Sequence, residues 1–209
     1  MPTIFLRCLP ERTRWSAVDD PARPVQLVLA SASPRREQLL GLLGLPFVVQ
    51  PADIDETPQL GELAEALVIR LASRKAETVA ARTPRAIVIG ADTVVVVDHH
   101  ILGKPTDESD ARWMLGLLSG RSHRVLTGIA VAAGGRTASA LEETSVTFDG
   151  LSQRDIDWYL ASREHQGKAG GYAIQGVAGT FITRLEGSFT GAVGLPLTTL
   201  RPMLVNAGL

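Results

Sequence analysis

Continuous apolar runs predict that this chain contains several short buried strands. The clearest run is residues 86–97, AIVIGADTVVVV, which is apolar enough to be buried on both faces of a sheet. Shorter runs at residues 25–30, VQLVLA, and 46–52, PFVVQPA, predict two further strands early in the chain. Ten of the twelve residues in the clearest run are apolar or glycine, and its one charged residue is Asp92, near the middle of the run.

Longer strand-like segments follow in the second half of the chain. Residues 123–133 and 136–148 are joined by Gly134–Gly135, and two glycines between strand-like segments predict a β-hairpin. Residues 180–185, TFITRL, predict a last strand. The late strands follow one another as long antiparallel strands, whereas the early strands alternate with helical segments.

Helical periodicity fills most of the remaining sequence. We expect a helix to begin at Pro34, with Ser33 as its N-cap and Gly44 just beyond its end. A longer helix is expected over residues 58–82, and Lys75 lies inside its apolar stripe. A further helix is expected to follow Thr106, its cap, and to end near residues 119–120. Two more are expected over residues 152–162 and about residues 195–206.

Early alternation of strands and helices, followed by long antiparallel strands, predicts one mixed α/β sheet with helices on both sides. We therefore expect a single domain over residues 25–209. Residues 1–24 contain prolines and arginines but little periodicity. We expect them to be a poorly ordered N-terminal extension, and they lack the apolar core and cleavage site of a secretory signal.

Composition narrows the possible partners and location. The chain has 209 residues and a net charge of −1, so no overall basic charge favours nucleic acid or an anionic membrane. No apolar run approaches the roughly 18 residues of a membrane span. The single cysteine, Cys8, excludes an internal disulfide and fits a reducing cytoplasm, where we expect the protein to be located.

Asp92 is the first candidate for chemistry. A lone carboxylate in apolar surroundings costs several kcal/mol unless it is paired, protonated or bound to a metal. One explanation is a structural partner, such as a nearby lysine or a backbone N–H group. The other is that the acid serves as a general base, because apolar surroundings shift a carboxyl pKa in useful ways.

Cationic residues suggest what such a base would act on. In SASPRR, residues 31–36, a strand leads directly into a helix start, where free N–H groups, hydroxyls and the guanidinium groups of Arg35 and Arg36 suit phosphate. Lys75 and Lys104 could add further neutralising charge. The alternatives are an ordinary capped helix with surface arginines and, for Lys75, a lysine that reaches solvent from the edge of the apolar stripe.

Acidic residues complement these cations. Glu56 lies in the acidic loop DIDE, and its carboxylate together with that of Asp92 would suit Mg²⁺ or Mn²⁺ bridged to substrate phosphates. A solvated loop acid is the alternative for Glu56. The chain contains no Walker A loop, nucleophile elbow or zinc motif.

Several motifs in order give the chain a specific resemblance. The segments LASASPRR, GADTVVVV, LGKP, KAGGYAIQG and GSFTGAVGLPL resemble the Maf family of nucleotide pyrophosphatases, and the likeness extends from about Leu27 to the C-terminus. It implies a two-lobed α/β fold with a central cleft, related to the inosine triphosphate pyrophosphatases. The implied reaction is hydrolysis of a nucleoside triphosphate to the monophosphate and pyrophosphate, with a divalent cation as cofactor.

The resemblance also implies roles for particular residues. Asp92 corresponds to the family's general base. Phosphate and metal contacts of the family correspond to Ser31, Arg36, Glu56, Lys75 and Lys104 of this chain. Substrate choice in one subfamily corresponds to Arg35, Thr93 and Gln175, a combination that resembles the branch acting on dTTP and UTP, with modified pyrimidine nucleotides as further candidates.

Two departures and two alternatives accompany this resemblance. Phe189 and Gly191 stand where the family motif usually has tyrosine and asparagine, and the lost phenol and amide would loosen base contacts or the cleft edge.

A nucleotide-binding regulator of septum formation with little turnover is one alternative function, and a phosphatase or nucleotidyl transferase is another. The family likeness also suggests a homodimer.

Overall fold

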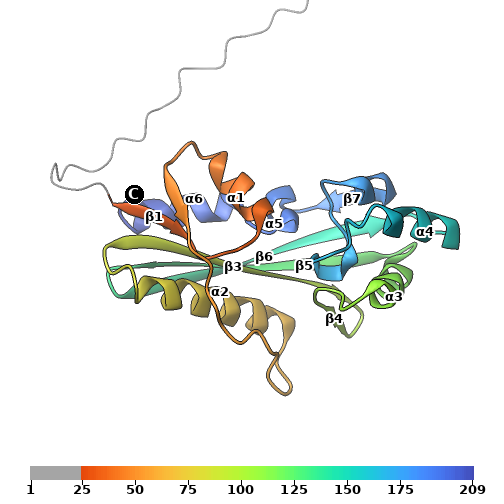
Figure 1. Cartoon of the computed structure of the whole chain (residues 1–209), viewed down its shortest axis with the longest axis horizontal. Coiled ribbons are helices and arrows are strands. Elements are labelled where there is room, and N and C mark those ends of the chain that lie inside the picture. Colours follow the sequence, from red (N-terminus) through yellow and green to blue (C-terminus); the bar gives the residue numbers. More distant parts are fainter. Residues whose placement is uncertain (1–24) are drawn as a thin grey trace, which may run out of the picture.

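The structure is a computed structural model that describes residues 25–209 (Figure 1). The extension expected at residues 1–24 lies outside the described residues. The fold is built on one seven-stranded mixed sheet, whose main path runs in the order β2-β1-β3-β5-β6-β7, with β4 paired to β3. The strands are β1 (Gln26–Leu29), β2 (Phe47–Val49), β3 (Ala86–Val97), β4 (His100–Leu102), β5 (Ser122–Ala133), β6 (Arg136–Phe148) and β7 (Ile182–Glu186).

Helices cover both faces of this sheet, as the sequence predicts. They are α1 (Pro34–Gly41), α2 (Ala64–Ala80), α3 (Glu108–Leu118), α4 (Gln153–Ala161), α5 (Phe189–Val193) and α6 (Leu197–Asn206), with 3₁₀ turns η1 (Ala169–Gly171) and η2 (Val177–Phe181). Helix α2 packs alone on one face, while the other helices contribute to the main apolar cluster on the opposite face.

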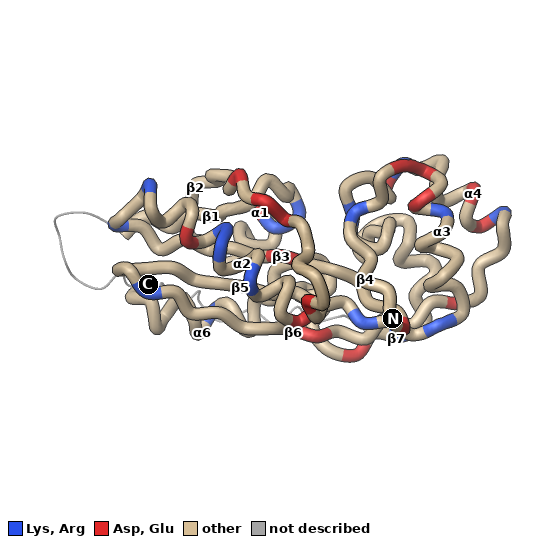
Figure 2. Tube along the Cα trace, turned by 90° about the horizontal axis from the view of Figure 1, so that it is seen from below, with Lys and Arg blue, Asp and Glu red and all other residues tan. Residues whose placement is uncertain are grey.

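Three long strands connect two lobes. β1 pairs in parallel with both β2 and β3. The successive pairs β3–β5, β5–β6 and β6–β7 are antiparallel. In Figure 1, α1, α2 and α6 lie around one end of these strands, and α3 and α4 lie around the other. Figure 2 shows the two lobes from below, with basic and acidic residues interspersed over both. The predicted two-lobed α/β fold is therefore confirmed.

Glycines in the sheet allow α2 to lie directly against it. A Cβ atom at Gly90 would be 2.2 Å from the carbonyl oxygen of Ala72, and one at Gly128 would be 2.3 Å from that of Val68. Only glycine permits such a close approach of helix backbone to strand backbone. This contact places the middle of α2, including Lys75, beside β3.

The start of α2 differs from the sequence prediction. The helix begins at Ala64 with Leu63 as N-cap, and not at residue 58. The preceding loop is held by Glu62, which accepts hydrogen bonds from the N–H of Gln59 and from the Arg70 side chain. These contacts, with Gly61 in the left-handed conformation, stabilise a loop where the apolar spacing alone predicts a helix.

The bounds of the other predicted strands and helices are closer to the sequence predictions. The β5–β6 hairpin turns at Gly134–Gly135, both with positive φ, as expected. Helix α3 is capped by Asp107, whose side chain accepts from Asp110 N, and not by Thr106. No helix within residues 25–209 is both long and apolar enough to cross a membrane.

Candidate active site

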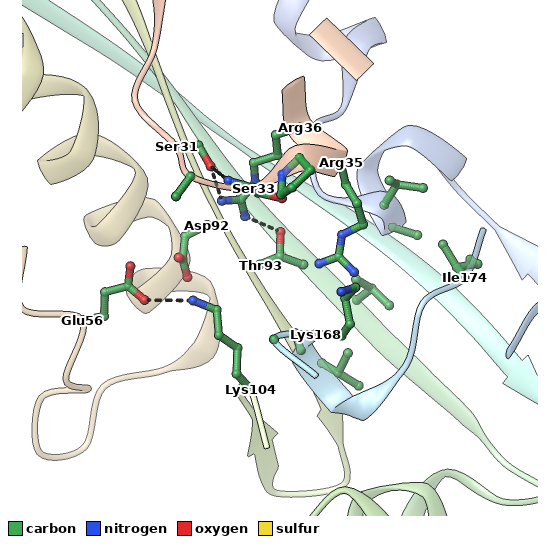
Figure 3. Close-up of a pocket in the computed structure, with 18 of the residues that line it drawn as sticks. Ser31, Ser33, Arg35, Arg36, Glu56, Asp92, Thr93, Lys104, Lys168 and Ile174 are labelled. Atoms are coloured by element: carbon green, nitrogen blue, oxygen red, sulfur yellow. Dashed lines mark hydrogen bonds and ion pairs between the residues drawn. The ribbon is translucent and has the colours of Figure 1, made fainter. Parts of the chain in front are cut away.

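A pocket of about 480 Å³ lies between the two lobes (Figure 3). Its walls come from the β1–α1 turn and the start of α1, the Glu56 loop, α2, β3, the segment after β4, β5, the chain between α4 and η2, and α5. Every candidate residue named from the sequence lines this pocket: Ser31, Arg35, Arg36, Glu56, Lys75, Asp92, Thr93, Lys104 and Gln175. The structure therefore gathers in one place residues that are far apart along the chain.

Asp92 has both a structural partner and access to the pocket. Side chains alternate along β3, so Asp92 points toward the α2 face, where Lys75 Nζ donates to its Oδ1 at 2.6 Å. The Asp92 residue is only 8% exposed, yet it lines the pocket. Within residues 25–209, Oδ2 has no hydrogen-bond partner, which leaves one oxygen free to accept a proton.

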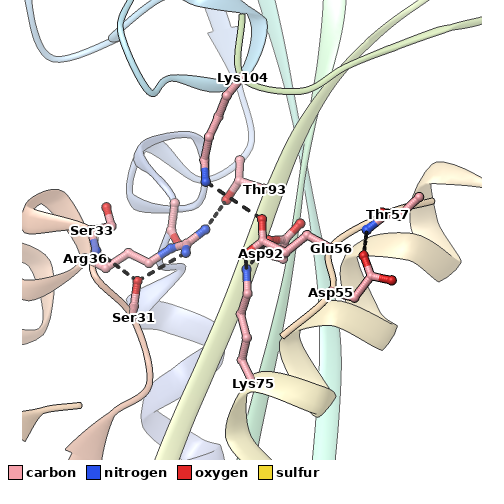
Figure 4. A network of polar contacts seen from close by, with 11 residues as sticks. Ser31, Ser33, Arg36, Asp55, Glu56, Thr57, Lys75, Asp92, Thr93 and Lys104 are labelled. Atoms are coloured by element: carbon pink, nitrogen blue, oxygen red, sulfur yellow. Dashed lines mark hydrogen bonds and ion pairs between the residues drawn. The ribbon is translucent and has the colours of Figure 1, made fainter. Parts of the chain in front are cut away.

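Lys75 also binds the second carboxylate of the site (Figure 4). Its Nζ lies 2.7 Å from Glu56 Oε1, and Lys104 Nζ lies 3.8 Å from Glu56 Oε2. Partial burial opposes ionisation of Glu56, but the hydrogen bond and charge of Lys75, followed by the charges of Lys104 and Arg36, lower its pKa below the ordinary value. Glu56 is consequently an anion held by two cations.

Arg36 is fixed on the opposite side of β3 by neutral oxygen atoms. Its guanidinium donates to Gly194 O at 2.8 Å, Ser31 Oγ at 3.3 Å and Thr93 Oγ1 at 3.1 Å. Burial lowers the pKa of Arg36, and the charges of Asp92 and Glu56 oppose that shift. None of these direct partners is an acid, so the positive charge of Arg36 remains available to an anion in the pocket.

Ser31 and Thr93 are thus placed as partners of Arg36. The Thr93 hydroxyl is also 3.0 Å from Thr127 Oγ1, so it is held from two sides. Strand alternation explains why Thr93 faces Arg36 while its neighbour Asp92 faces α2.

Lys168 is a pocket cation that the sequence reasoning missed. Figure 3 shows Lys168 and the Arg35 guanidinium on the same side of the pocket, directed toward each other. Burial lowers the pKa of Arg35 to about 10, with Arg36 adding to the effect, and burial followed by the charge of Arg35 lowers that of Lys168. Within the described residues neither forms an ion pair with an acid. The sequence feature that could have pointed to Lys168 is its position at the start of the glycine-rich segment KAGGYAIQG.

The rest of the pocket is largely apolar. Val95, Val125, Tyr172, Ile174 and Val193 contribute to its walls, and the exposed residue Gln175 lies on its rim. Such a surface suits a planar base more than a phosphate.

The two departures from the family motif lie outside the pocket lining. Phe189 is half exposed on α5, and Gly191 is buried. A Cβ atom at Gly191 would be 2.9 Å from Glu142 Cγ, so an asparagine would require Glu142 to move. Neither departure removes a side chain that lines the pocket.

Comparison with known proteins decides the family. Residues 26–207 match the family described as Maf-like protein. The chain belongs to the Maf family. A relative named dTTP/UTP pyrophosphatase from Symbiobacterium thermophilum is 50% identical over 183 residues, covering 88% of this chain and 94% of the relative. A relative of the same name from Caulobacter vibrioides is 52% identical over 184 residues, covering 87% and 95%.

A distant match exists among solved structures. A HAM1 protein from Coxiella burnetii matches this Maf chain with a TM-score of 0.47 and 18% identity, covering 88% of this chain and 100% of that one. At this level the similarity carries no functional information.

The carboxylates of this Maf chain fit one kind of metal site. Residues 25–209 contain no group of three or more histidine, cysteine or acidic side chains that could enclose a metal ion. Glu56 and Asp92, however, direct one oxygen each toward the same ammonium group, so the two carboxylates converge. Mg²⁺ is commonly bound by one or two carboxylates together with substrate phosphates and water. The pair therefore fits an ion shared with a bound phosphate.

Proposed function

We propose that this chain is a nucleoside triphosphate pyrophosphatase that hydrolyses dTTP and UTP, and related modified pyrimidine nucleotides, to the monophosphate and pyrophosphate. The observation that carries the proposal is Asp92, which Lys75 holds through Oδ1 and whose Oδ2, among the described residues, has no partner in the cation-lined pocket. The names and high identity of the relatives support the same activity.

In this proposal Asp92 acts as the general base. Its Oδ2 accepts a proton from water as the water oxygen attacks the α phosphorus. The bond from that phosphorus to the bridging oxygen breaks, and the electron pair leaves with pyrophosphate. Lys75 keeps the carboxylate oriented, while Arg36, Lys104 and the start of α1 offset phosphate charge. Positioning and electrostatic stabilisation provide most of the acceleration in such reactions.

We also propose that Glu56 and Asp92 hold a divalent cation, Mg²⁺ or Mn²⁺. When bound, such an ion would neutralise phosphate charge and polarise the phosphorus–oxygen bonds. Lys75 contacts the same two carboxylates, so it offsets their mutual repulsion. This role of Lys75 depends only on contacts within the chain.

Selectivity for the base is assigned to the Gln175 side of the pocket. An amide offers both a donor and an acceptor, which matches the O4 and N3–H groups of uracil and thymine. A site built for that pattern leaves polar groups unpaired with other bases, and this disfavours them strongly. Arg35 and Lys168 add donors that suit carbonyl oxygens, and Thr93 holds Arg36 in place.

A screen of nucleoside triphosphates with Mg²⁺ or Mn²⁺, with separate detection of pyrophosphate and orthophosphate, tests the proposal. We expect pyrophosphate from dTTP and UTP, with lower kcat/KM for ATP and GTP. Orthophosphate as the first product would instead indicate a phosphatase. Tight binding without turnover would indicate a nucleotide-binding regulator of septum formation. The cytoplasmic location and the homodimer stay predictions.

A further inference from the structure

Glu164 contacts the chain just after Gln175, although it does not itself line the pocket. Its Oε2 accepts a hydrogen bond from the backbone N–H of Val177 at 2.8 Å. Val177 is two residues beyond Gln175 and begins η2. The carboxylate therefore restrains the backbone that carries the proposed base-selecting amide.

Gly176 shows how closely this carboxylate approaches the same segment. A Cβ atom at Gly176 would lie 2.1 Å from Glu164 Oε2, and the three nearest heavy atoms all belong to Glu164. The φ angle of Gly176 is −109°, which other residues also adopt. A side chain at position 176 would therefore displace the Glu164 carboxylate, so glycine here leaves room for that carboxylate beside the backbone.

The end of α4 directs Glu164 toward this segment. Arg163 has a φ of 60°, the left-handed conformation that commonly ends a helix. The next N–H, that of Glu164, donates to Ser162 Oγ at 3.2 Å. The turn sends the Glu164 side chain back toward residues 176–177, so a helix end in the second lobe braces the rim of the pocket.

We propose that Glu164 is a positioning residue for base selection, because it fixes the backbone directly after Gln175 relative to the pocket. The proposal rests on the proposed pyrophosphatase function. Within residues 25–209, the Gln175 side chain makes no hydrogen bond of its own, so its direction depends on its backbone. An amide can discriminate between bases only when its donor and acceptor are held in a defined place.

The ratio of kcat/KM for UTP to that for CTP measures this role. The two bases differ at C4 and N3, where cytosine has an amino group and an unprotonated nitrogen. We expect Glu164→Ala to lower the ratio about tenfold, mainly through a higher KM for UTP, with kcat nearly unchanged. Glu164→Gln keeps an acceptor oxygen and should retain most of the ratio. Glu77→Ala, which removes an exposed acid from α2, is the matched control.

Gly176→Ala provides an independent variant that keeps the carboxylate. Its methyl group would displace Glu164 from Val177 N–H, so the UTP-to-CTP ratio should fall as it does in Glu164→Ala. In the double variant Glu164→Ala/Gly176→Ala the clash is absent, and the two effects should be clearly less than additive. The test remains valid if Glu164→Ala is less stable than the wild type, because the concentration of active enzyme cancels in the ratio of the two kcat/KM values.

The outcomes separate this inference from the proposed function. Unchanged ratios in both single variants, with normal UTP hydrolysis, would overturn the role of Glu164 and leave the pyrophosphatase function intact. Equal losses for UTP and CTP would also overturn it, because they indicate a general structural role. Failure of the wild-type chain to release pyrophosphate from UTP would reject the proposed function itself.

Discussion

Lys75 Nζ lies 2.6 Å from Asp92 Oδ1, and both side chains are about nine-tenths buried. This ion pair explains how an acid is tolerated in the middle of an apolar strand, because an unpaired buried carboxylate is strongly unfavourable. It also leaves Oδ2 available in the pocket. The structural and catalytic explanations of Asp92 are therefore compatible, since the same lysine that stabilises the acid also orients it.

Removal of Lys75 alone should destabilise the fold. Lys75→Met leaves Asp92 buried without its cation, and we expect the free energy of unfolding to fall by about 3 kcal/mol. Urea denaturation at pH 7 measures this. The double variant Lys75→Met/Asp92→Asn should recover much of the loss, because no unpaired charge remains. Equal stability of Lys75→Met and the wild type would show that the pair contributes little.

Removal of the base should affect turnover. Asp92→Asn keeps the size of the side chain but cannot accept the proton, so kcat for UTP should fall by about 10²–10⁴-fold or more. Steady-state pyrophosphate release measures this, and Asp53→Asn, an exposed acid outside the pocket lining, is the control. Near wild-type turnover in Asp92→Asn would exclude Asp92 as the base.

The proposed metal role of Glu56 predicts a shifted requirement for Mg²⁺. Glu56→Gln removes one of the two converging carboxylates, so half-maximal activity should need about tenfold more Mg²⁺. A Mg²⁺ titration of UTP hydrolysis measures this. Glu37→Gln, which changes an exposed acid on α1, is the control. Glu62→Gln would not serve, because Glu62 stabilises the loop before α2. An unchanged Mg²⁺ dependence in Glu56→Gln would remove Glu56 from the proposed site.

Lys168 should contribute to substrate binding although it has no acidic partner among residues 25–209. Lys168→Met removes a charged donor from the pocket, and a charge-assisted hydrogen bond contributes about 1.5–3 kcal/mol, so KM for UTP should rise about 10- to 100-fold. Arg154→Met removes one exposed positive charge from α4, outside the pocket lining, and serves as the control. Similar KM values for the two variants would contradict a specific contact by Lys168.

His123 should make the fold sensitive to acid. Burial lowers its pKa from 6.5 to about 4, and its Nε2 lies 2.7 Å from the Tyr172 hydroxyl. The folded pKa is the lower one, so the unfolded chain binds the proton first. The contribution to stability is complete above about pH 6.5 and is lost as the pH falls toward 4, by up to about 3 kcal/mol.

His123→Phe tests this dependence. The variant should lose less stability between pH 7 and pH 4.5 than the wild type does, although it leaves the Tyr172 hydroxyl without its partner. Urea midpoints at the two pH values measure the difference. Parallel losses in both proteins would show that His123 does not contribute to the acid sensitivity.

Local patterns predicted most strands and helix ends correctly. The run at residues 86–97 forms β3 with those same bounds, because continuous apolar sequence needs burial on both faces. The expected start of α2 was wrong because the loop before Ala64 is stabilised by Glu62 and Arg70, a contact that apolar spacing does not reveal. Lys168 was missed for a related reason, since its importance depends on the neighbouring Arg35.

The sequence by itself determined the order of the long strands and helices, but not the short elements β4 and α5. It also determined the burial of Asp92 and the motifs that mark the family. These properties depend on residue type and on spacing within single elements. Only the tertiary structure decided that Lys75 of α2 meets Asp92, and that Glu164 reaches the segment after Gln175. Those contacts arise from packing between distant elements, where side-chain volume and backbone approach at positions such as Gly90 determine which groups can meet.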